Sequence, residues 1–356
     1  MPITAHRLAR QLIARQPLKS PAAVVAWFGA IQAQDYLAAL WALGLRTPKA
    51  AEGTIEAAIA DGSVIRTHAF RGTWQYVTPG DLRWMLGLVG ARVIAASASR
   101  YRELELDPKT LMRCEELFAR ALSGGKQLTR AEMARVLTQR RVPAVNRRLI
   151  HILGHAELDG VICSGGRRGK QPTFALLDDR VPRSRPISHD EALARIASRY
   201  FQSRGPATDR DLAWWTGLPL TMARRAIDLS AGGLESAMID GERYWFTGGA
   251  ARPARSPDAH LLPAFDEYLV GYQNRSAMLD PRHLRKVNAG GGMLKPAVVV
   301  DGRVVGTWRR VLEKGSVSVT ALLFEPPSAV QHNAITKATD RYAGFLGLTP
   351  RLVIRR

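Results

Sequence analysis

The chain has 356 residues, with 51 Lys and Arg against 31 Asp and Glu, which gives a formal charge of +20 at pH 7. That excess favours a polyanionic partner, first of all nucleic acid, although drift of a GC-rich genome toward arginine is the alternative explanation. The length predicts two to four domains, Cys114 and Cys163 are too few for a disulfide framework, and no uncharged apolar run reaches the roughly 18 residues of a membrane span.

One order of elements, helices followed by two β-like runs, occurs three times along the first 250 residues. A helix-period pattern precedes each pair of runs, and a turn separates the two runs of a pair. The predicted helices are 5–14, 21–30, 36–45 and 53–60 in the first round, 82–97, 108–122, 130–138 and 145–158 in the second, and 190–203, 209–216 and 219–229 in the third. The predicted strands lie within 64–77, at 160–163 and 173–176, and at 234–239 and 244–246.

Helices followed by a two-stranded hairpin are typical of the winged helix, a helix-turn-helix motif with a β wing. Thr129 and Thr208 each precede a predicted helix and have an acidic residue three positions later, as in a capping box. Each of these threonines would open the first helix of a helix-turn-helix pair. We therefore predict three winged helices, over 1–80, 81–182 and 183–250.

The pattern changes after residue 248. Residues 250–258 are rich in proline and arginine and show no periodicity, so we expect a linker there. Short β-like runs follow, and Asp301-Gly302 between two of them is a strong hairpin signal. Residues 328–346 have the pattern of one amphipathic helix. We predict a β-rich, barrel-like C-terminal domain over 258–356 and an α+β fold for the chain.

Two glutamines, Gln32 and Gln34, stand one residue apart between two apolar segments and are followed by Asp35. Side chains two apart share a side of an extended chain but point in different directions on a helix, so the pair can act together only if the chain is extended there. The alternative is that both are ordinary polar positions at a helix end. In a strand Asp35 would face away from the pair, whereas a helical turn would reverse that orientation.

Four motifs, in order along the chain, resemble the AlkZ-type winged-helix DNA glycosylases. They are Gln32-Ala33-Gln34-Asp35, Arg71-Gly72-Thr73-Trp74, Leu262-Pro263-Ala264-Phe265-Asp266-Glu267-Tyr268, and the segment from Lys295-Pro296 through Asp301-Gly302 to Gly306-Thr307-Trp308-Arg309. The resemblance implies three tandem winged helices and a C-terminal barrel in a C-shaped body around DNA. It also implies excision of alkylated purines and, in one branch of the family, unhooking of interstrand crosslinks.

The catalytic signature of that family is Gln-Φ-Gln or Gln-Φ-Asp, where Φ is small or apolar, and Gln32-Ala33-Gln34 matches the first form. The resemblance therefore implies catalytic roles for Gln32 and Gln34. Many relatives carry proline after Gln-x-Gln-Asp, where this chain has Tyr36. An N7- or N3-alkylated purine is already positively charged and leaves as a neutral base, so no strong general acid is needed. Amide oxygens can hold a water and face a sugar with oxocarbenium character.

Basic residues at two places predict contacts with DNA. One pair opens a helix that would serve for recognition, and a glycine-rich tip separates the strands of the second hairpin. The predicted DNA-binding residues are Arg147, Arg148, Arg167, Arg168 and Lys170. A wing tip that touches phosphates is the favoured interpretation of the second group, and a merely solvated loop is the alternative.

Two further groups of residues are ambiguous. His151 and His155 are four apart on a predicted helix, a spacing that could hold zinc, but no third ligand is evident nearby. We interpret them as core or DNA-facing histidines and expect no metal and no cofactor. Asp266-Glu267 could supply a helix cap or a second acidic contribution to the site.

Two functions from different classes remain. One is a monofunctional DNA glycosylase that excises N7- or N3-alkylated purines by water attack at the sugar. The other is a non-catalytic winged-helix DNA-binding protein, regulatory or architectural. The sequence has no heptad seam or sensor motif, which favours the enzyme. We expect a monomer that acts on alkylated double-stranded DNA and is cytoplasmic and nucleoid-associated, because Arg7, Arg10 and Arg15 interrupt any apolar run of a secretory signal.

Overall fold

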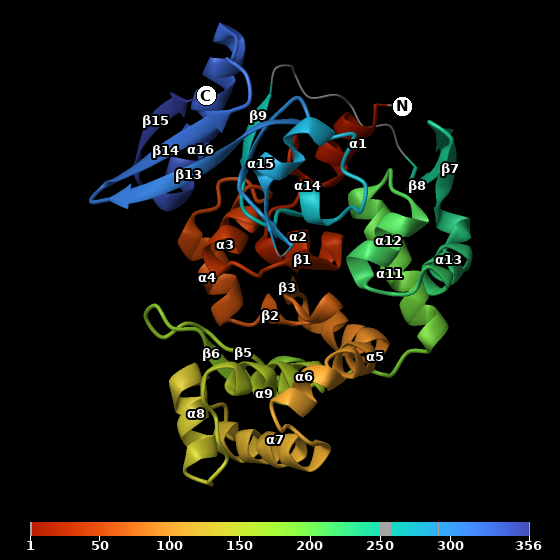
Figure 1. The fold of residues 1–356 in the computed structure, drawn as a ribbon, viewed down its shortest axis with the longest axis vertical. Helices are drawn as coiled ribbons and strands as arrows, with labels where there is room; N and C mark the ends of the chain where they lie inside the picture. Colours follow the sequence, from red (N-terminus) through yellow and green to blue (C-terminus); the bar gives the residue numbers. More distant parts are fainter. Residues whose placement is uncertain (1, 249–257, 291, 356) are drawn as a thin grey trace. The chain divides into compact units, whose positions relative to one another are not determined.

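The structure is a computed structural model that describes residues 2–248, 258–290 and 292–355. The chain divides into two compact units, Met1–Ile55 with Leu193–Arg356, and Glu56–Ala192, and each contains helices and strands (Figure 1). The α+β prediction is therefore confirmed, while the four predicted domain boundaries stay predictions. The predicted linker lies outside the described residues except for Asp258. In the described part of the chain, no helix combines the length and apolarity needed to cross a membrane.

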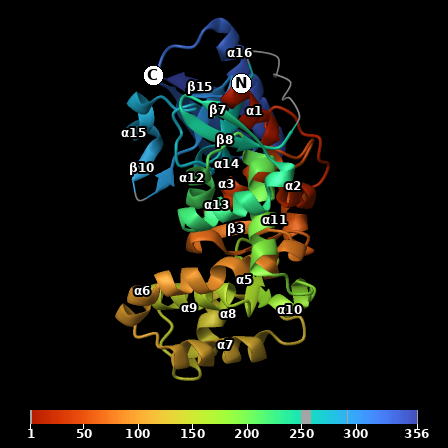
Figure 2. The same cartoon turned by 90° about the vertical axis from the view of Figure 1, so that its right-hand side faces the viewer.

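The elements of the unit Glu56–Ala192 follow the predicted order. They are β2 (Ile65–His68), η1 (Phe70–Gly72), β3 (Trp74–Val77), α5 (Pro79–Ala96), α6 (Ala98–Glu103), α7 (Pro108–Leu122), β4 (Leu128–Thr129), α8 (Arg130–Thr138), α9 (Asn146–Leu158), β5 (Ile162–Ser164), β6 (Thr173–Leu176) and α10 (Leu177–Arg180). Helices α7, α8 and α9 are grouped together (Figure 2). Strand β6 pairs antiparallel with both β4 and β5, and β2 pairs antiparallel with β3, so both predicted hairpins are present.

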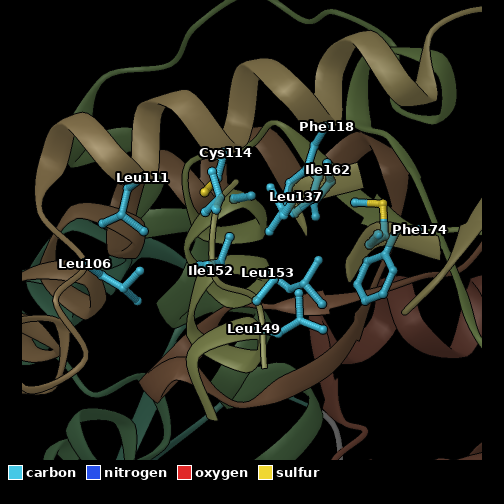
Figure 3. Packing of buried hydrophobic residues seen from close by; sticks show 14 of the residues in the cluster. Leu106, Leu111, Cys114, Phe118, Leu137, Leu149, Ile152, Leu153, Ile162 and Phe174 are labelled. Atoms are coloured by element: carbon cyan, nitrogen blue, oxygen red, sulfur yellow. The ribbon is translucent and has the colours of Figure 1, made fainter. Parts of the chain in front are cut away.

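The core of this unit forms where apolar faces of α7 and α9 meet β5 and β6 (Figure 3). Along α7 the buried residues recur every three or four positions, as an amphipathic helix requires. They are Leu111, Cys114, Phe118 and Leu122. Burial raises the pKa of Cys114 to about 11 and that of Cys163 to about 12, so both thiols stay protonated and unreactive at neutral pH.

The elements of the other unit come from both ends of the chain. They are α1 (Ile3–Arg10), α2 (Pro21–Phe28), β1 (Ala30–Gln32), α3 (Tyr36–Gly44), α4 (Glu52–Ala60, which continues past Ile55), α11 (His189–Arg204, which begins before Leu193), α12 (Asp209–Thr216), α13 (Leu220–Leu229), η2 (Ala231–Gly233), β7 (Glu235–Ile239), β8 (Glu242–Phe246), β9 (Ala259–Leu262), α14 (Glu267–Val270), η3 (Pro281–His283), α15 (Leu284–Val287), β10 (Asn288–Gly290), β11 (Met293–Leu294), β12 (Ala297–Val300), β13 (Arg303–Glu313), β14 (Ser316–Leu323), α16 (Ala329–Leu346) and β15 (Thr349–Arg355). The predicted helix 5–14 ends early, because Leu12 adopts the left-handed φ of 59°.

Caps and turns explain several of these boundaries. Thr129 and Thr208 each form the predicted capping box, with Glu132 and Asp211 respectively. The turn at Asp301-Gly302 joins β12 to β13, and both of its residues have positive φ, as the tight turns of hairpins require. Both motifs were predicted from sequence and are confirmed.

The C-terminal strands form one open sheet in the order β15-β14-β13-β12-β9. Neighbouring strands are antiparallel except β14 and β15, which are parallel. Within the described residues β15 and β9 are the two ends of this order, so the barrel-like prediction is wrong. The physical reason is that α16 packs against β9, β14 and β15 and covers their apolar face. In a closed barrel, other strands of the same sheet would cover that face instead.

An aromatic cluster fixes α16 and α3 against this sheet. Tyr342 of α16 packs edge-on against Trp41 and Trp308, with ring centroids 5.0 Å apart in both cases. The indole nitrogen of Trp41 donates to the carbonyl of Leu261, and that of Trp308 donates to the carbonyl of Leu262, each at 2.7 Å. The segment that follows β9, which carries Asp266 and Glu267, is thereby joined to α3.

Candidate active site

The backbone around the two glutamines is extended and then turns into a helix. Gln32 is the last residue of β1, and Gln34 lies in the bend between β1 and α3. The side chain of Gln32 is largely buried, whereas Gln34 is exposed. The chain is therefore extended at Gln32, which the pairing hypothesis requires, and Gln34 is accessible from outside the protein.

The residues after the glutamines form a helix cap. The Oδ1 of Asp35 accepts a hydrogen bond from the backbone nitrogen of Ala38 at 3.0 Å, so this carboxylate is the N-cap of α3. Tyr36 is the first residue of the helix, a position at which proline is also favoured. Tyrosine or proline at this position is therefore compatible with the same backbone path.

A buried carboxylate lies directly against the backbone of Gln32. The Oε1 of Glu267 accepts a hydrogen bond from the backbone nitrogen of Gln32 at 2.7 Å. Its Oε2 accepts two hydrogen bonds from Arg204, at 2.7 and 2.9 Å, and one from the indole nitrogen of Trp215 at 3.2 Å. Glu267 is only 1% exposed, and its contact with Gln32 is to the backbone.

Arg204, the cation of this ion pair, contacts the same segment. Its Nη1 donates to the carbonyl of Phe28 at 3.0 Å, and its Nη2 donates to the carbonyl of Ala30 at 2.7 Å. The guanidinium also lies over the ring of Trp215, 4.0 Å from the centroid. Gly29, between the two carbonyls, has a φ of 77°, which favours glycine at this turn.

A second buried ion pair adjoins the first. Arg46 and Asp266 form two hydrogen bonds of 2.8 Å, and neither side chain is exposed. Arg46 also donates to the carbonyls of Ala42 and Gln11, each at 2.9 Å. Asp266 in addition caps α14 by accepting a hydrogen bond from the backbone nitrogen of Tyr268 at 2.9 Å. The structure therefore assigns Asp266 to a cap and Glu267 to the backbone of Gln32.

The predicted DNA-binding residues near the start of α9 differ in their surroundings. Arg147 is exposed. Arg148 donates to the carbonyls of Leu104 and Glu105, the second at 3.1 Å, and so joins α9 to the end of α6. Of this pair, Arg147 has its side chain on the surface, and Arg148 supports the fold.

The basic residues of the β5–β6 tip also differ in whether a carboxylate of the protein pairs with them. Arg167 pairs with Glu56, and Arg168 binds both oxygens of Glu132, at 2.8 and 3.1 Å. Hydrogen bonds from Thr129 and then from Arg168 lower the pKa of Glu132 to about 2, so this carboxylate stays ionised. Lys170 is exposed in the turn itself. Two of the three cations at the tip are thus balanced by carboxylates of the protein.

The two histidines of α9 are half-buried. The Nδ1 of His155 is 2.7 Å from an oxygen of Glu115, and the rings of His151 and His155 pack edge-on against Tyr101. Across the described ranges, no cluster of three or more His, Cys, Asp and Glu side chains could hold a metal. These contacts place both rings at the edge of the core, and the interpretation as core or DNA-facing histidines stays a prediction.

Sequence reasoning missed a buried pair in the same unit. The Nδ1 of His68 binds Glu157, which is fully buried on α9, and burial raises the pKa of that carboxyl. Arg204 was also missed, and no periodic or motif signal distinguished it from the many other arginines. The sequence signal for the residues that support the glutamines was the acidic pair Asp266-Glu267.

Comparison with known proteins identifies the relatives of this chain. A family model described as DNA glycosylase AlkZ-like matches residues 25–345. An interstrand DNA cross-link repair glycosylase of Streptomyces sahachiroi is 28% identical over 324 residues, which cover 87% of each chain. The solved structure of the Streptomyces sahachiroi DNA glycosylase AlkZ superposes with a TM-score of 0.80 at 25% identity, covering 99% of this chain and 98% of that one.

Proposed function

The chain belongs to the AlkZ-like family of DNA glycosylases, and from this premise we propose that it excises N7- and N3-alkylated purines from duplex DNA by water attack at the sugar. The enzyme assignment argues against the alternative of a non-catalytic DNA-binding regulator. The observation that carries the proposal is the pair of amides at the end of β1. Gln32 is held at its backbone by a buried carboxylate, and Gln34 follows it in an exposed bend.

The chemistry of the proposed substrate fits amide side chains. Alkylation at N7 or N3 gives the base a positive charge, so cleavage of the glycosidic bond releases a neutral leaving group without protonation. The remaining requirements are a positioned water and stabilisation of positive charge on the sugar, which amide oxygens provide without titrating. We propose that Gln32 and Gln34 hold the attacking water between them. Because a glutamine is not an effective base, undamaged purines remain uncleaved.

The arrangement of the chain also supports the proposed mode of DNA binding. We propose that the three rounds of helices and hairpin act as winged helices on double-stranded DNA, and that the protein acts as a monomer. The relative that is named for interstrand cross-link repair motivates a second proposed substrate, a crosslink between two alkylated purines. Unhooking would require the same glycosidic cleavage at one of the two bases.

The direct test uses the wild-type protein and a duplex with a single N7-methylguanine. With enzyme in excess, we expect release of the modified base and appearance of an abasic site, while the same duplex without the lesion stays intact. A duplex with a nitrogen-mustard crosslink, examined in parallel, tests the second substrate. No release from any alkylated duplex would contradict the proposed activity.

The contacts at the β5–β6 tip predict which cations serve DNA binding. We expect Lys170→Ala and Arg147→Ala each to weaken binding about equally for all sequences and to reduce the slope of log affinity against log salt by about 1. Arg168→Ala is the matched variant, and we expect a smaller change in slope because Glu132 already balances its charge. Binding isotherms at several salt concentrations measure this. A slope that responds to Arg168→Ala but not to Lys170→Ala would reverse the assignment.

A further inference from the structure

Three backbone contacts, at alternate residues, fix the segment that leads into the glutamine pair. Arg204 binds the carbonyls of Phe28 and Ala30, and Glu267 binds the amide of Gln32. The two side chains that make these contacts are joined to each other by two hydrogen bonds. An ion pair whose contacts come from 174 or more positions away in the sequence therefore holds this segment by its peptide groups.

Neither member of this pair can reach a substrate. The side chains of Arg204 and Glu267 are 0% and 1% exposed, respectively. The donors of Arg204 and both carboxylate oxygens of Glu267 are already engaged with protein partners. The contacts of this pair with the segment that leads to the glutamines are made through the backbone of residues 28–32.

We propose that Arg204 and Glu267 are positioning residues of the glycosylase reaction. Their ion pair fixes the backbone position from which the side chain of Gln32 extends. It also fixes the point at which the chain enters the bend at Gln34. This inference depends on the proposed role of the two glutamines in holding the water. A side chain that positions a water must stand within about 0.5 Å of its productive place, and a displacement of about 1 Å can cost on the order of a hundredfold in rate.

The matched test compares the same substitution in the two adjacent ion pairs. In Arg204→Lys the charge opposite Glu267 remains, but one ammonium cannot replace the fork that binds two carbonyls and a carboxylate together. Arg46→Lys makes the same change in the pair with Asp266, whose hydrogen bonds do not involve residues 28–32. The guanidinium of Arg46 lies 5.3 Å from the ring centroid of Phe28, and a lysine ammonium can keep such a cation–π contact. Both substitutions alter a fully buried pair, so we expect both to lower the melting temperature.

We expect the two variants to differ in the rate of base release and not in thermal stability. At a temperature well below both melting transitions, we expect Arg204→Lys to lower the single-turnover rate of base release by tenfold or more, with the Kd for the duplex within a few-fold of wild type. We expect Arg46→Lys to keep its rate within about threefold. Equal losses of rate in the two variants, or full activity of a folded Arg204→Lys protein, would overturn the proposal.

A second readout does not depend on catalysis. Backbone amide exchange measured on the peptide that contains Gln32 reports whether its hydrogen bond to Glu267 is held. We expect faster exchange there in Arg204→Lys and wild-type exchange in Arg46→Lys. If the wild-type protein released no base, the proposed function would fail, and the exchange rates would still decide whether the ion pair holds the strand. Unchanged exchange in Arg204→Lys would reject the positioning role.

A milder variant covers the case in which Arg204→Lys does not fold. Trp215→Phe keeps both charges and an aromatic ring under Arg204. It removes the indole hydrogen bond to Oε2 of Glu267 and, because Trp215 is buried and phenylalanine is smaller, leaves a small cavity. We expect a drop in rate of several-fold with an unchanged Kd, and faster exchange at Gln32. An unchanged rate together with unchanged exchange would count against the proposal.

Discussion

Replacement of Gln34 by alanine is expected to lower excision of an N7-alkylguanine by about a hundredfold or more while leaving DNA affinity within a few-fold of wild type. A contact that positions the attacking water matters chiefly in the transition state, whereas affinity comes from phosphate contacts elsewhere. Because Gln34 is exposed in a bend, its removal leaves no cavity in the core. The measurement is single-turnover release of the modified base, with the melting temperature as the control for folding.

Three companion variants sharpen this result. We expect Gln32→Ala to behave like Gln34→Ala, and the double variant to be little worse than either, because the two amides act on one water. Gln34→Asp recreates the other signature of the family and is expected to retain part of the activity. Full activity of a well-folded Gln34→Ala protein would remove the catalytic assignment.

Local patterns in the sequence predicted most of the regular structure. The helices at α2, α3, α7, α8 and α16 were predicted within about two residues of their observed ends, because apolar residues recur with helical period and polar residues cap the termini. The hairpin at Asp301-Gly302 followed from turn chemistry. Strand β15 was missed, because it pairs in parallel with β14 across the whole of α16 and has no turn signal of its own.

The support of the candidate site could not be predicted in this way. Glu267 meets the amide of Gln32 from 235 positions away, and Asp266 meets Arg46 from 220 positions away. No periodicity links residues at such separations, because their proximity results from packing of the whole unit. The resemblance to a family marked Asp266 and Glu267 as part of a motif, and only the structure distinguishes a helix cap from a contact to the backbone of Gln32.

The arginines of the chain also have two uses that composition does not separate. The formal charge of +20 was interpreted as a surface for DNA. Yet Arg7, Arg46 and Arg204 are among the largest fully buried side chains, and each lies within 4.0 Å of a buried carboxylate. Part of the arginine content therefore serves the interior, where its planar fork binds carboxylates and carbonyls at once.

The buried ion pair of Arg46 and Asp266 leads to the second prediction of a large effect, which concerns stability. We expect Asp266→Asn to lower the free energy of unfolding by about 3–5 kcal/mol and the melting temperature by on the order of 10 °C, because it leaves the guanidinium of Arg46 buried without a countercharge. The change is nearly isosteric, so lost packing contributes little. Thermal unfolding followed by calorimetry or circular dichroism measures it.

The matched control is Glu313→Gln, which makes the same carboxylate-to-amide change in a solvent-exposed pair with Arg351 at 3.1 Å. We expect it to leave the melting temperature almost unchanged, because exposed pairs are weakened by solvent and by side-chain entropy. Arg46→Met combined with Asp266→Asn removes the uncompensated charge and is expected to recover part of the loss, although the carbonyls of Ala42 and Gln11 stay without this donor. Equal melting temperatures for Asp266→Asn and Glu313→Gln would mean that the buried pair contributes no more to stability than an exposed one.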